Sequence, residues 1–340
     1  MFNPKYTITN RLLGNIKKIS EIVVVLNNQK FSNVVLMEFE KKAREISVYS
    51  STSIEGNPLP LTEVKKILKS RPEYIRDTEK EVLNYNEALE ELNNNLKGKP
   101  FDLSLILNIQ KTITKDLVKK QHSGRLRKEP VVVNDPNARR VVYIPPDYQD
   151  AEKLLRDLFL YIQRNANIVD PLILAGIFHK QFVVIHPFID GNGRTARLGT
   201  KALLAKIGLN TFNLFSFENY YNKNVTKYFK EVGVFGDYYE IEKNIDFTSW
   251  LEYFTDGIID ELLRVKKELK NETISPKEEL QEWHYIILDY IKKKGYIRDR
   301  DYSKLTNRAK ATRNLDFKKL IDLGLIEKLG KGKGTYYKLL

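Results

Sequence analysis

One segment of this sequence constrains the fold more than any other, because residues 172–185 are apolar on nearly every side. Asp170 and Pro171 stand directly before it, and a capping residue followed by a proline is typical of the first turn of a helix. A helix without a polar face must be covered by other elements, so we expect it at the centre of a packed domain. A second helix is predicted directly after it, over residues 195–207, with Gly208 at its end.

Most of the remaining sequence also predicts helices, since apolar residues recur at three- and four-residue steps in the segments 35–49, 80–96, 102–119 and 151–164. The exception is the region 124–146, where two β-favouring runs flank a turn-rich stretch at 134–137. We therefore expect a mostly α-helical protein that carries one isolated β-hairpin. A hairpin of this kind is typical of a flap rather than of a core element.

The composition excludes several classes of protein. Apolar residues make up 42% of the 340 residues, which is typical of a folded chain, yet no apolar run reaches the length of a membrane span. The chain has no cysteine, which excludes disulfides, thiolate zinc sites and a cysteine nucleophile, and it has only four histidines. The first residues lack the apolar run of a secretory signal, so we expect a cytoplasmic protein without a membrane partner.

The positive charge is concentrated near the C-terminal end. The formal net charge is +13, and residues 281–340 hold 15 Lys and Arg against 7 Asp and Glu. The charged segment 267–279 predicts a linker. Helical patterns and a two-stranded ribbon beyond it predict a small winged helix-turn-helix domain over 280–340. The charge suggests a nucleic-acid partner, and a solvated lysine-rich surface or a protein-interaction module explains it equally well.

The densest chemical signal lies between the two apolar helices, in the string IHPFIDGNGRTAR over residues 185–197. Its glycines let the backbone turn sharply and approach a ligand. The backbone N–H groups of residues 191–194 stand at a helix start, where they and the helix dipole favour an anion. Arg194 and Arg197 are three residues apart, so both guanidiniums can reach the same anion.

Two further side chains of this string carry reactive groups. Asp190 is a hard oxygen ligand beside the anion, suited to Mg²⁺ that keeps most of its water. His186 stands at the entrance of the loop, where its imidazole can take a proton from an incoming nucleophile. Together these residues are the parts of a site that transfers a phosphate-containing group from a nucleoside triphosphate.

The string is similar to the signature of the Fic (filamentation induced by cAMP) family, His-x-Phe-x-Asp/Glu-Gly-Asn-Gly-Arg-x-x-Arg, and matches it at every defined position. The resemblance implies transfer of AMP from ATP to a hydroxyl side chain of a target protein. It implies His186 as the general base, Asp190 as the Mg²⁺ ligand and Phe188 as the anchor of the loop. The phosphate-binding residues that it implies are Gly191, Asn192, Gly193, Arg194 and, at the γ-phosphate, Arg197.

A second string, STSIEGN over residues 51–57, resembles the inhibitory motif of the same family, Ser/Thr-x-x-x-Glu-Gly/Asn. In that family the motif places its glutamate against the second arginine of the signature, which here pairs Glu55 with Arg197. A carboxylate on the arginine that the γ-phosphate needs leaves ATP in a non-productive pose. The resemblance therefore implies self-inhibition by an N-terminal helix, with Ser51 and Glu55 as inhibitory residues.

Two more regions resemble parts of Fic proteins. The hairpin is similar to the flap that pairs with an extended target segment, with Val131, Val132 and Val133 as target-docking residues. Tyr220 and Asn224 lie in a segment that resembles the helix on the nucleoside side. The predicted domains are an N-terminal helical region with the inhibitory helix (1–100), a Fic catalytic core (101–266), the linker (267–279) and the winged domain (280–340).

The predicted function is protein adenylyltransferase, with ATP and Mg²⁺ as cofactors and a target protein that offers a Ser, Thr or Tyr hydroxyl. Two alternatives stay open, namely removal of AMP from a modified target by the same fold, and a nucleotide-sensing DNA-binding regulator without transferase activity. Self-modification, DNA and a second copy of the chain in a homodimer are further partners to consider. The C-terminal segment resembles winged modules of bacterial regulators, whose DNA contacts would here be Lys310, Arg313, Lys331 and Lys333.

Overall fold

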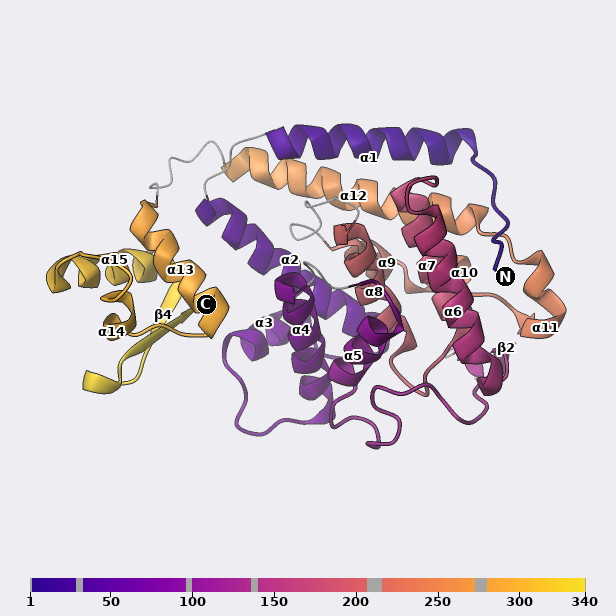
Figure 1. Ribbon diagram of the computed structural model, residues 1–340, viewed down its shortest axis with the longest axis horizontal. Coiled ribbons are helices and arrows are strands. Elements are labelled where there is room, and N and C mark those ends of the chain that lie inside the picture. Colours follow the sequence, from indigo (N-terminus) through magenta and orange to yellow (C-terminus); the bar gives the residue numbers. More distant parts are fainter. Residues whose placement is uncertain are drawn as a thin grey trace. The chain divides into compact units, whose positions relative to one another are not determined.

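The computed structural model of the chain describes residues 2–28, 33–95, 100–135, 140–206, 216–272 and 280–339. The chain divides into two compact units, one made of residues 1–29 and 42–267, the other of residues 30–41 and 268–340. Both are mostly helical, as predicted (Figure 1). Within these described ranges, no helix is both long and apolar enough to cross a membrane.

The first unit is built almost entirely from helices, with a small sheet at one side. Its helices in chain order are α1 (Asn10–Asn28), α2 (Asn33–Ile54, which begins in the second unit), α3 (Leu61–Lys69), α4 (Asp77–Asn95), α5 (Leu103–Ile113), α6 (Tyr148–Asn165), α7 (Pro171–Ile185), α8 (Asn192–Lys206), α9 (Phe217–Lys223), α10 (Val225–Val232), α11 (Tyr238–Ile241) and α12 (Thr248–Glu272, which ends in the second unit).

Helix α7 is buried along nearly its whole length, which confirms the prediction from its apolar sequence. The Asp170 side chain caps it by accepting a hydrogen bond from the Leu172 amide at 2.8 Å. Helices α6 and α8 pack against α7, and α12 comes so close that a Cβ atom at Gly176 would collide with Leu251. Trp250 of α12 stabilises this close packing of α12 on α7, because its Nε1 donates to the Gly176 carbonyl at 2.8 Å.

The predicted hairpin is present as part of a three-stranded sheet. Strands β1 (Val133–Asp135) and β2 (Arg140–Ile144) pair antiparallel, and β3 (Gly236–Asp237) pairs with β2 in parallel. The hairpin is therefore not isolated, because a very short strand far along the chain, with no β pattern of its own, completes the sheet. Residues 136 and 137 of the predicted turn lie outside the described residues.

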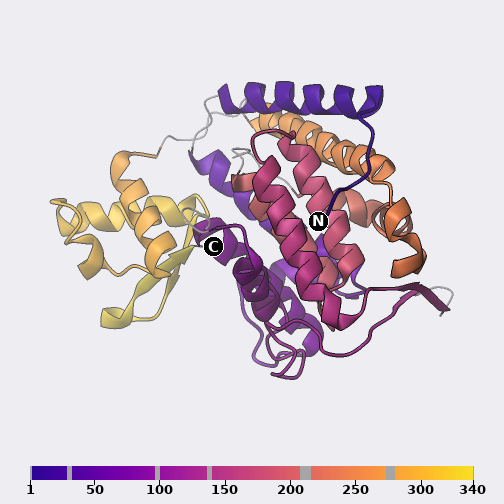
Figure 2. The same cartoon turned by 45° about the vertical axis from the view of Figure 1, so that its right-hand side comes forward.

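Helix α1 lies along α12, the indigo and orange helices of Figures 1 and 2. Asn15 donates to the Asp256 carboxylate at 2.8 Å, and Arg11 pairs with the same carboxylate at 2.5 Å. Helix α12 continues to Glu272, so residues 267–272 of the predicted linker are helical. Lys and Glu are good helix formers, and their charges do not end a helix. Residues 273–279 of that linker lie outside the described residues.

The second unit has the order of elements that the sequence predicts, helices followed by a two-stranded ribbon. The helices are α13 (Glu282–Lys294), α14 (Asp299–Tyr302) and α15 (Lys310–Asp322), and strands β4 (Ile326–Leu329) and β5 (Tyr336–Leu339) pair antiparallel. In its core the Phe317 ring stacks on the Tyr337 ring at 4.0 Å, and Ile297 pairs with Tyr337 through an isolated bridge.

Candidate active site

The site forms where α7 and α8 meet, around a connection that we call the signature loop (residues 186–191). Helix α8 begins at Asn192, earlier than the predicted start at Thr195. The added turn forms because the Thr195 amide donates to the Gly191 carbonyl at 2.9 Å. The helix start therefore lies inside the glycine-containing string. The predicted helix end at 207–208 lies outside the described residues.

The signature loop is shaped by Asn192 and Phe188. The Asn192 side chain accepts a hydrogen bond from the Phe188 amide and donates one to the Phe188 carbonyl, both at 2.9 Å. The Phe188 ring is completely buried, as expected of an anchor, 6.0 Å from the ring of Phe182. The Asn192 side chain is thus engaged within the loop through both its oxygen and its NH₂ group.

The two glycines of the string meet different requirements. Gly191 has a left-handed backbone with φ of +82°, a conformation that favours glycine. At Gly193 the requirement is space, because a Cβ atom there would lie 2.3 Å from the Oε1 atom of Glu55. Glycine at 193 therefore lets the end of α2 approach the start of α8.

Arg197 is completely buried and is bound by the end of α2. Its Nε donates to the Ser51 hydroxyl at 2.7 Å, and its Nη2 donates to the Ser51 carbonyl at 2.9 Å and to Glu55 Oε1 at 2.7 Å. Burial by itself lowers the pKa of Arg197, but the Glu55 carboxylate and nearby groups outweigh it, and the pKa lies well above its usual value. The structure thus pairs Glu55 with Arg197, as the family resemblance implies, and adds Ser51 as a further partner of the same guanidinium.

A chain of buried polar groups supports Arg197 from the side away from Ser51. The Arg197 Nη1 donates to the Tyr228 hydroxyl at 3.4 Å, and that hydroxyl lies 3.0 Å from His179 Nε2. Thr200 donates its own proton to the Ala196 carbonyl, so His179 Nδ1 is the donor to Thr200 and Nε2 accepts from Tyr228. Burial lowers the pKa of His179 well below its usual value, so this ring is neutral. His179 is a packed helix histidine with a defined polar role.

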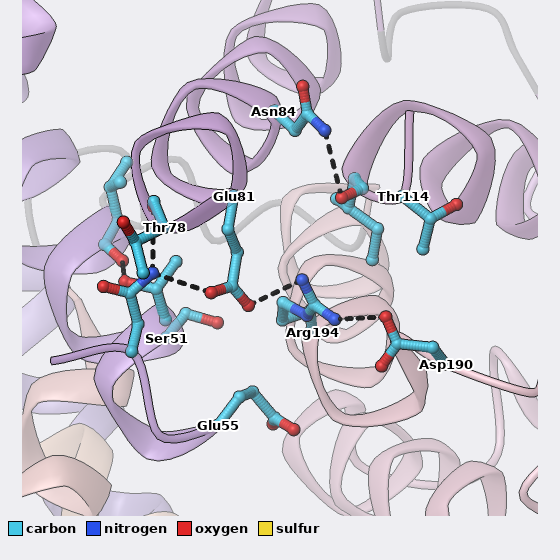
Figure 3. A network of polar contacts seen from close by, with 12 residues as sticks. Ser51, Glu55, Thr78, Glu81, Asn84, Thr114, Asp190 and Arg194 are labelled. Carbon is cyan, nitrogen blue, oxygen red and sulfur yellow. Dashed lines mark hydrogen bonds and ion pairs between the residues drawn. The ribbon is translucent and has the colours of Figure 1, made fainter. Parts of the chain in front are cut away.

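Arg194 lies between two carboxylates. Its Nη2 donates to Asp190 Oδ2 at 2.8 Å, and its Nη1 pairs with Glu81 Oε1 of α4 at 2.6 Å (Figure 3). Sequence reasoning predicts Asp190 and Arg194 but misses Glu81. The α4 sequence offers several glutamates at helical spacing, and nothing in their pattern distinguishes Glu81 from the others.

His186 ends α7 with a left-handed backbone, φ 50°, and is partly buried. Burial lowers the pKa of its imidazole to about 4, so the ring is neutral at physiological pH. Its Nδ1 lies 3.3 Å from the Val183 carbonyl, and in that contact only Nδ1 can be the donor. Nε2 is therefore the unprotonated nitrogen, able to accept a proton.

Sequence reasoning also misses Arg127, which fastens the base of the flap to the signature loop. Its amide donates to the Pro187 carbonyl and its Nε donates to the His186 carbonyl, both at 2.9 Å. Tyr143 of β2 adds a second link, because its hydroxyl donates to the Val184 carbonyl at 2.8 Å. The flap and the end of α7 are therefore joined through backbone carbonyls next to His186.

Tyr220 and Asn224, predicted on the nucleoside side, make other contacts. The Tyr220 ring packs on the ring of Tyr253 in α12 at 5.2 Å. The Asn224 side chain caps α10 by accepting from the Lys227 amide at 3.0 Å. From the same segment it is Tyr228 that reaches Arg197. The nucleotide roles of Tyr220 and Asn224 stay predictions.

The four residues predicted to contact DNA differ in their exposure and in their contacts within the C-terminal unit. Lys310 at the start of α15 and Lys331 in the ribbon turn are exposed. The Lys333 side chain lies outside the described residues. Arg313 is engaged inside the unit, because its Nε and Nη2 bind the Asp299 carboxylate at 2.8 and 2.9 Å. Arg313 thus holds α15 to α14, and DNA binding by this unit stays a prediction.

Comparison with known proteins identifies sequences that are similar to this chain. The Fic/DOC family model matches residues 100–204. A protein adenylyltransferase Fic from Nematostella vectensis is 31% identical over 174 residues, which cover 49% of this chain and 39% of that protein. A protein adenylyltransferase Fic from Aedes aegypti is 28% identical over 227 residues, which cover 61% of this chain and 43% of that protein. The chain thus spans less than half the length of the curated relatives that it matches.

A solved structure shares the fold over the length of the chain. A Fic family protein from Desulfovibrio desulfuricans G20 has a TM-score of 0.64 and 19% sequence identity, and the match covers 100% of this chain and 98% of that one. At this identity the likeness concerns the fold alone. The signature is complete at residues 186–197 and lies inside residues 100–204, so the matched part of this chain is a Fic/DOC domain.

Proposed function

We propose that this protein is a protein adenylyltransferase, which transfers AMP from ATP to a hydroxyl side chain of a target protein. The observation that carries the proposal is that a neutral histidine, His186, ends α7 just before the glycine-containing start of α8, the helix that carries the buried Arg197. The curated relatives are named for the same activity. In the reaction the hydroxyl oxygen attacks the α-phosphorus, a new P–O bond forms, and the bond to the leaving pyrophosphate breaks.

His186 acts as the general base in this proposal. Because Nδ1–H points to the Val183 carbonyl, Nε2 takes the proton of the target hydroxyl as the P–O bond forms. The hydrogen bond from Arg127 to the His186 carbonyl fixes the backbone of this residue next to the flap. A positioned general base contributes about 10²–10⁴-fold to a reaction rate.

The start of α8 and its two arginines bind the triphosphate. The first N–H groups of a helix have no intrahelical partner, and they favour an anion together with the helix dipole. Arg194 supports the phosphate oxygens, and Arg197 binds the γ-phosphate. Ser51 and Tyr228 hold Arg197 in place, so its position is set before ATP arrives.

Magnesium fits this site as an ion that arrives with the nucleotide. The Asp190 side chain is 47% exposed, and its contact with Arg194 is made through Oδ2. Among the described residues, no group of three or more His, Asp or Glu side chains could hold a metal by itself. Mg²⁺ needs no such group when one carboxylate, the phosphates and water supply its ligands, so Asp190 is the residue that holds it. The bound ion neutralises charge on the phosphates.

Glu55 makes the enzyme self-inhibited in this proposal. Its carboxylate binds Nη2 of Arg197 and occupies the space above Gly193. A γ-phosphate on the same guanidinium would meet a like charge at close range. ATP therefore adopts its productive pose only when Glu55 has moved away from Arg197.

The flap offers an edge strand to the target protein. The strand order β1-β2-β3 leaves one side of β1 without a partner strand in the described sheet. Val132 stands directly before β1 and is 48% exposed. An extended target segment can add to this edge through main-chain hydrogen bonds, with Val131, Val132 and Val133 against its side chains.

The position of a radioactive label tests this function. The purified full chain is incubated with Mg²⁺ and with ATP labelled at the α-phosphate, and separately with ATP labelled at the γ-phosphate. Because AMP retains the α-phosphorus while pyrophosphate carries the γ-phosphorus away, only the α label should enter protein. Incorporation of the γ label would identify a different group transfer, and incorporation of neither label by the Glu55→Gly variant would contradict the proposal.

A pH profile tests the state of His186. With a pKa of about 4, roughly 90% of the imidazole is neutral at pH 5, whereas an ordinary histidine with a pKa of about 6.5 is only about 3% neutral there. We therefore expect kcat/KM to fall by only about 10% through His186 between pH 8 and pH 5, because most of the base stays unprotonated. The measurement uses the Glu55→Gly enzyme at low ATP, where kcat/KM reports the free enzyme. An acid limb centred near pH 6.5 would contradict this assignment.

A further inference from the structure

Asn57, two residues after Glu55, ties the end of the inhibitory segment to α4. Its Nδ2 donates to Glu81 Oε2 at 2.7 Å and to the Thr78 carbonyl at 3.0 Å. Asn57 is buried, and its backbone N–H closes the turn by donating to the Thr52 carbonyl at 3.1 Å. The backbone that carries Glu55 is therefore fastened to α4 through one amide side chain.

Glu81 has its second partner in the signature itself. While Oε2 accepts from Asn57, Oε1 pairs with Arg194, which also binds Asp190 (Figure 3). The side chains of Arg194 and Glu81 are only 5% and 16% exposed, so water screens this ion pair weakly. Because Arg194 holds one oxygen of Glu81, the other oxygen stays directed at Asn57.

We infer that Asn57 and Glu81 form a latch that keeps Glu55 on Arg197, with Glu81 as the positioning residue. This inference rests on the proposed function, since it concerns the inhibition of that activity. Glu55 is 27% exposed, and in this inference it leaves Arg197 together with the turn at residues 55–57. The hydrogen bond from Asn57 to a charged, mostly buried carboxylate opposes that movement.

The latch also connects the inhibitory turn to the phosphate site. An incoming phosphate competes with Glu81 for the guanidinium of Arg194, because both are anions. When Arg194 turns toward phosphate, Glu81 loses the partner that directs its other oxygen at Asn57. Binding of nucleotide to Arg194 and binding of Glu55 to Arg197 therefore oppose each other. By linkage, each lowers the affinity of the other by the same factor.

Two substitutions break the latch without creating a cavity. In Glu81→Gln the amide oxygen keeps its place on Arg194, so the new NH₂ group faces the NH₂ group of Asn57. In Asn57→Asp two carboxylates face each other across the same 2.7 Å contact. The matched control is Glu87→Gln, because Glu87 lies on the same helix but is 49% exposed and pairs with Lys115 only at 3.8 Å.

Each single variant should raise the rate of AMP transfer on the order of 10-fold, as expected for the loss of one hydrogen bond to a charged group. The double variant should return toward the wild-type rate, because the glutamine NH₂ at position 81 then donates to the carboxylate at position 57 and the hydrogen bond re-forms in the opposite direction. In a Glu55→Gly background at saturating ATP neither change should raise the rate, since no carboxylate remains to be held on Arg197 and competition between Glu81 and phosphate no longer limits binding. Glu87→Gln should match the wild type. Single variants that transfer AMP at the wild-type rate would overturn the latch. An equal rise of the transfer rate in the Glu55→Gly background would also overturn it.

Amide hydrogen exchange on the full chain gives a readout that does not depend on catalysis. The amides of Glu55 and Gly56 donate to the carbonyls of Thr52 and Ser53, so a loosened turn exposes them. Without nucleotide, the backbone amides of residues 51–57 should exchange faster in both variants than in the wild type, and the amides of α7 should exchange at the wild-type rate. Uniformly faster exchange would overturn the latch in favour of general destabilisation. Faster exchange at 51–57 in variants of a chain that transfers no AMP would support the latch and refute the proposed function.

Discussion

Replacing Glu55 with glycine should activate AMP transfer by up to roughly 100-fold, if about 1% of the wild-type enzyme is competent. Glu55 Oε1 lies 2.7 Å from Nη2 of Arg197, the guanidinium that the γ-phosphate needs in the proposed mechanism. Glycine removes both the competing charge and the bulk above Gly193. The measurement is auto-adenylylation with α-labelled ATP at saturating Mg²⁺, for the wild type and the variant side by side.

Three further variants show whether this activation acts through Arg197. Glu55→Gln keeps the bulk and loses the charge, so it should activate less than Glu55→Gly. In an Arg197→Ala background Glu55→Gly should restore little, because the contact with the γ-phosphate is already lost. Glu63→Ala removes a carboxylate that is 45% exposed and should change nothing.

Two outcomes would contradict self-inhibition by Glu55. A wild type that already transfers AMP as fast as Glu55→Gly would refute the inhibition, although not the proposed adenylyltransferase activity. Loss in Glu55→Gly of an ability to remove AMP from modified protein would favour the reverse reaction, in which a glutamate positions water.

Replacing His186 with alanine should lower AMP transfer about 10²–10⁴-fold and leave ATP binding nearly unchanged. The imidazole is neutral and its Nδ1 is bound to a backbone carbonyl, so in the proposed mechanism it accepts the proton of the target hydroxyl and does not hold phosphate. The change is made in the Glu55→Gly enzyme, where the rate is high enough to follow a large loss. Calorimetry with a non-hydrolysable ATP analogue measures binding.

A second histidine provides the control for this experiment. His122 lies outside the signature loop, with its Nε2 3.9 Å from Glu129, and His122→Ala should retain transfer. Near-normal transfer by His186→Ala would show that the base is wrongly assigned. Loss of both transfer and ATP binding would indicate that His186 shapes the signature loop instead.

The chemistry of the signature loop is predictable because it is local. His186, Asp190, Arg194 and Arg197 come from one short string, and helix caps and apolar spacing place that string between two buried helices. Neighbour geometry along a helix is encoded in residue spacing, so the prediction that the two arginines can reach one anion needs no knowledge of the fold. The pairing of Glu55 with Arg197 is different, because it could be expected only from the family resemblance.

The partners of these residues could be known only from the tertiary structure. Glu81 looks like any glutamate of an exposed helix, Arg127 like any charge in a β segment, and Tyr228 like a core aromatic. Each acquires its role from a contact with an element far away in the sequence, and local periodicity carries no information about which faces will meet. The short strand β3 joins the flap in the same way, because pairing across the fold rather than its own sequence makes it a strand. Residue types and spacing thus predict the candidate reacting groups, and packing between distant helices decides which carboxylate faces which arginine.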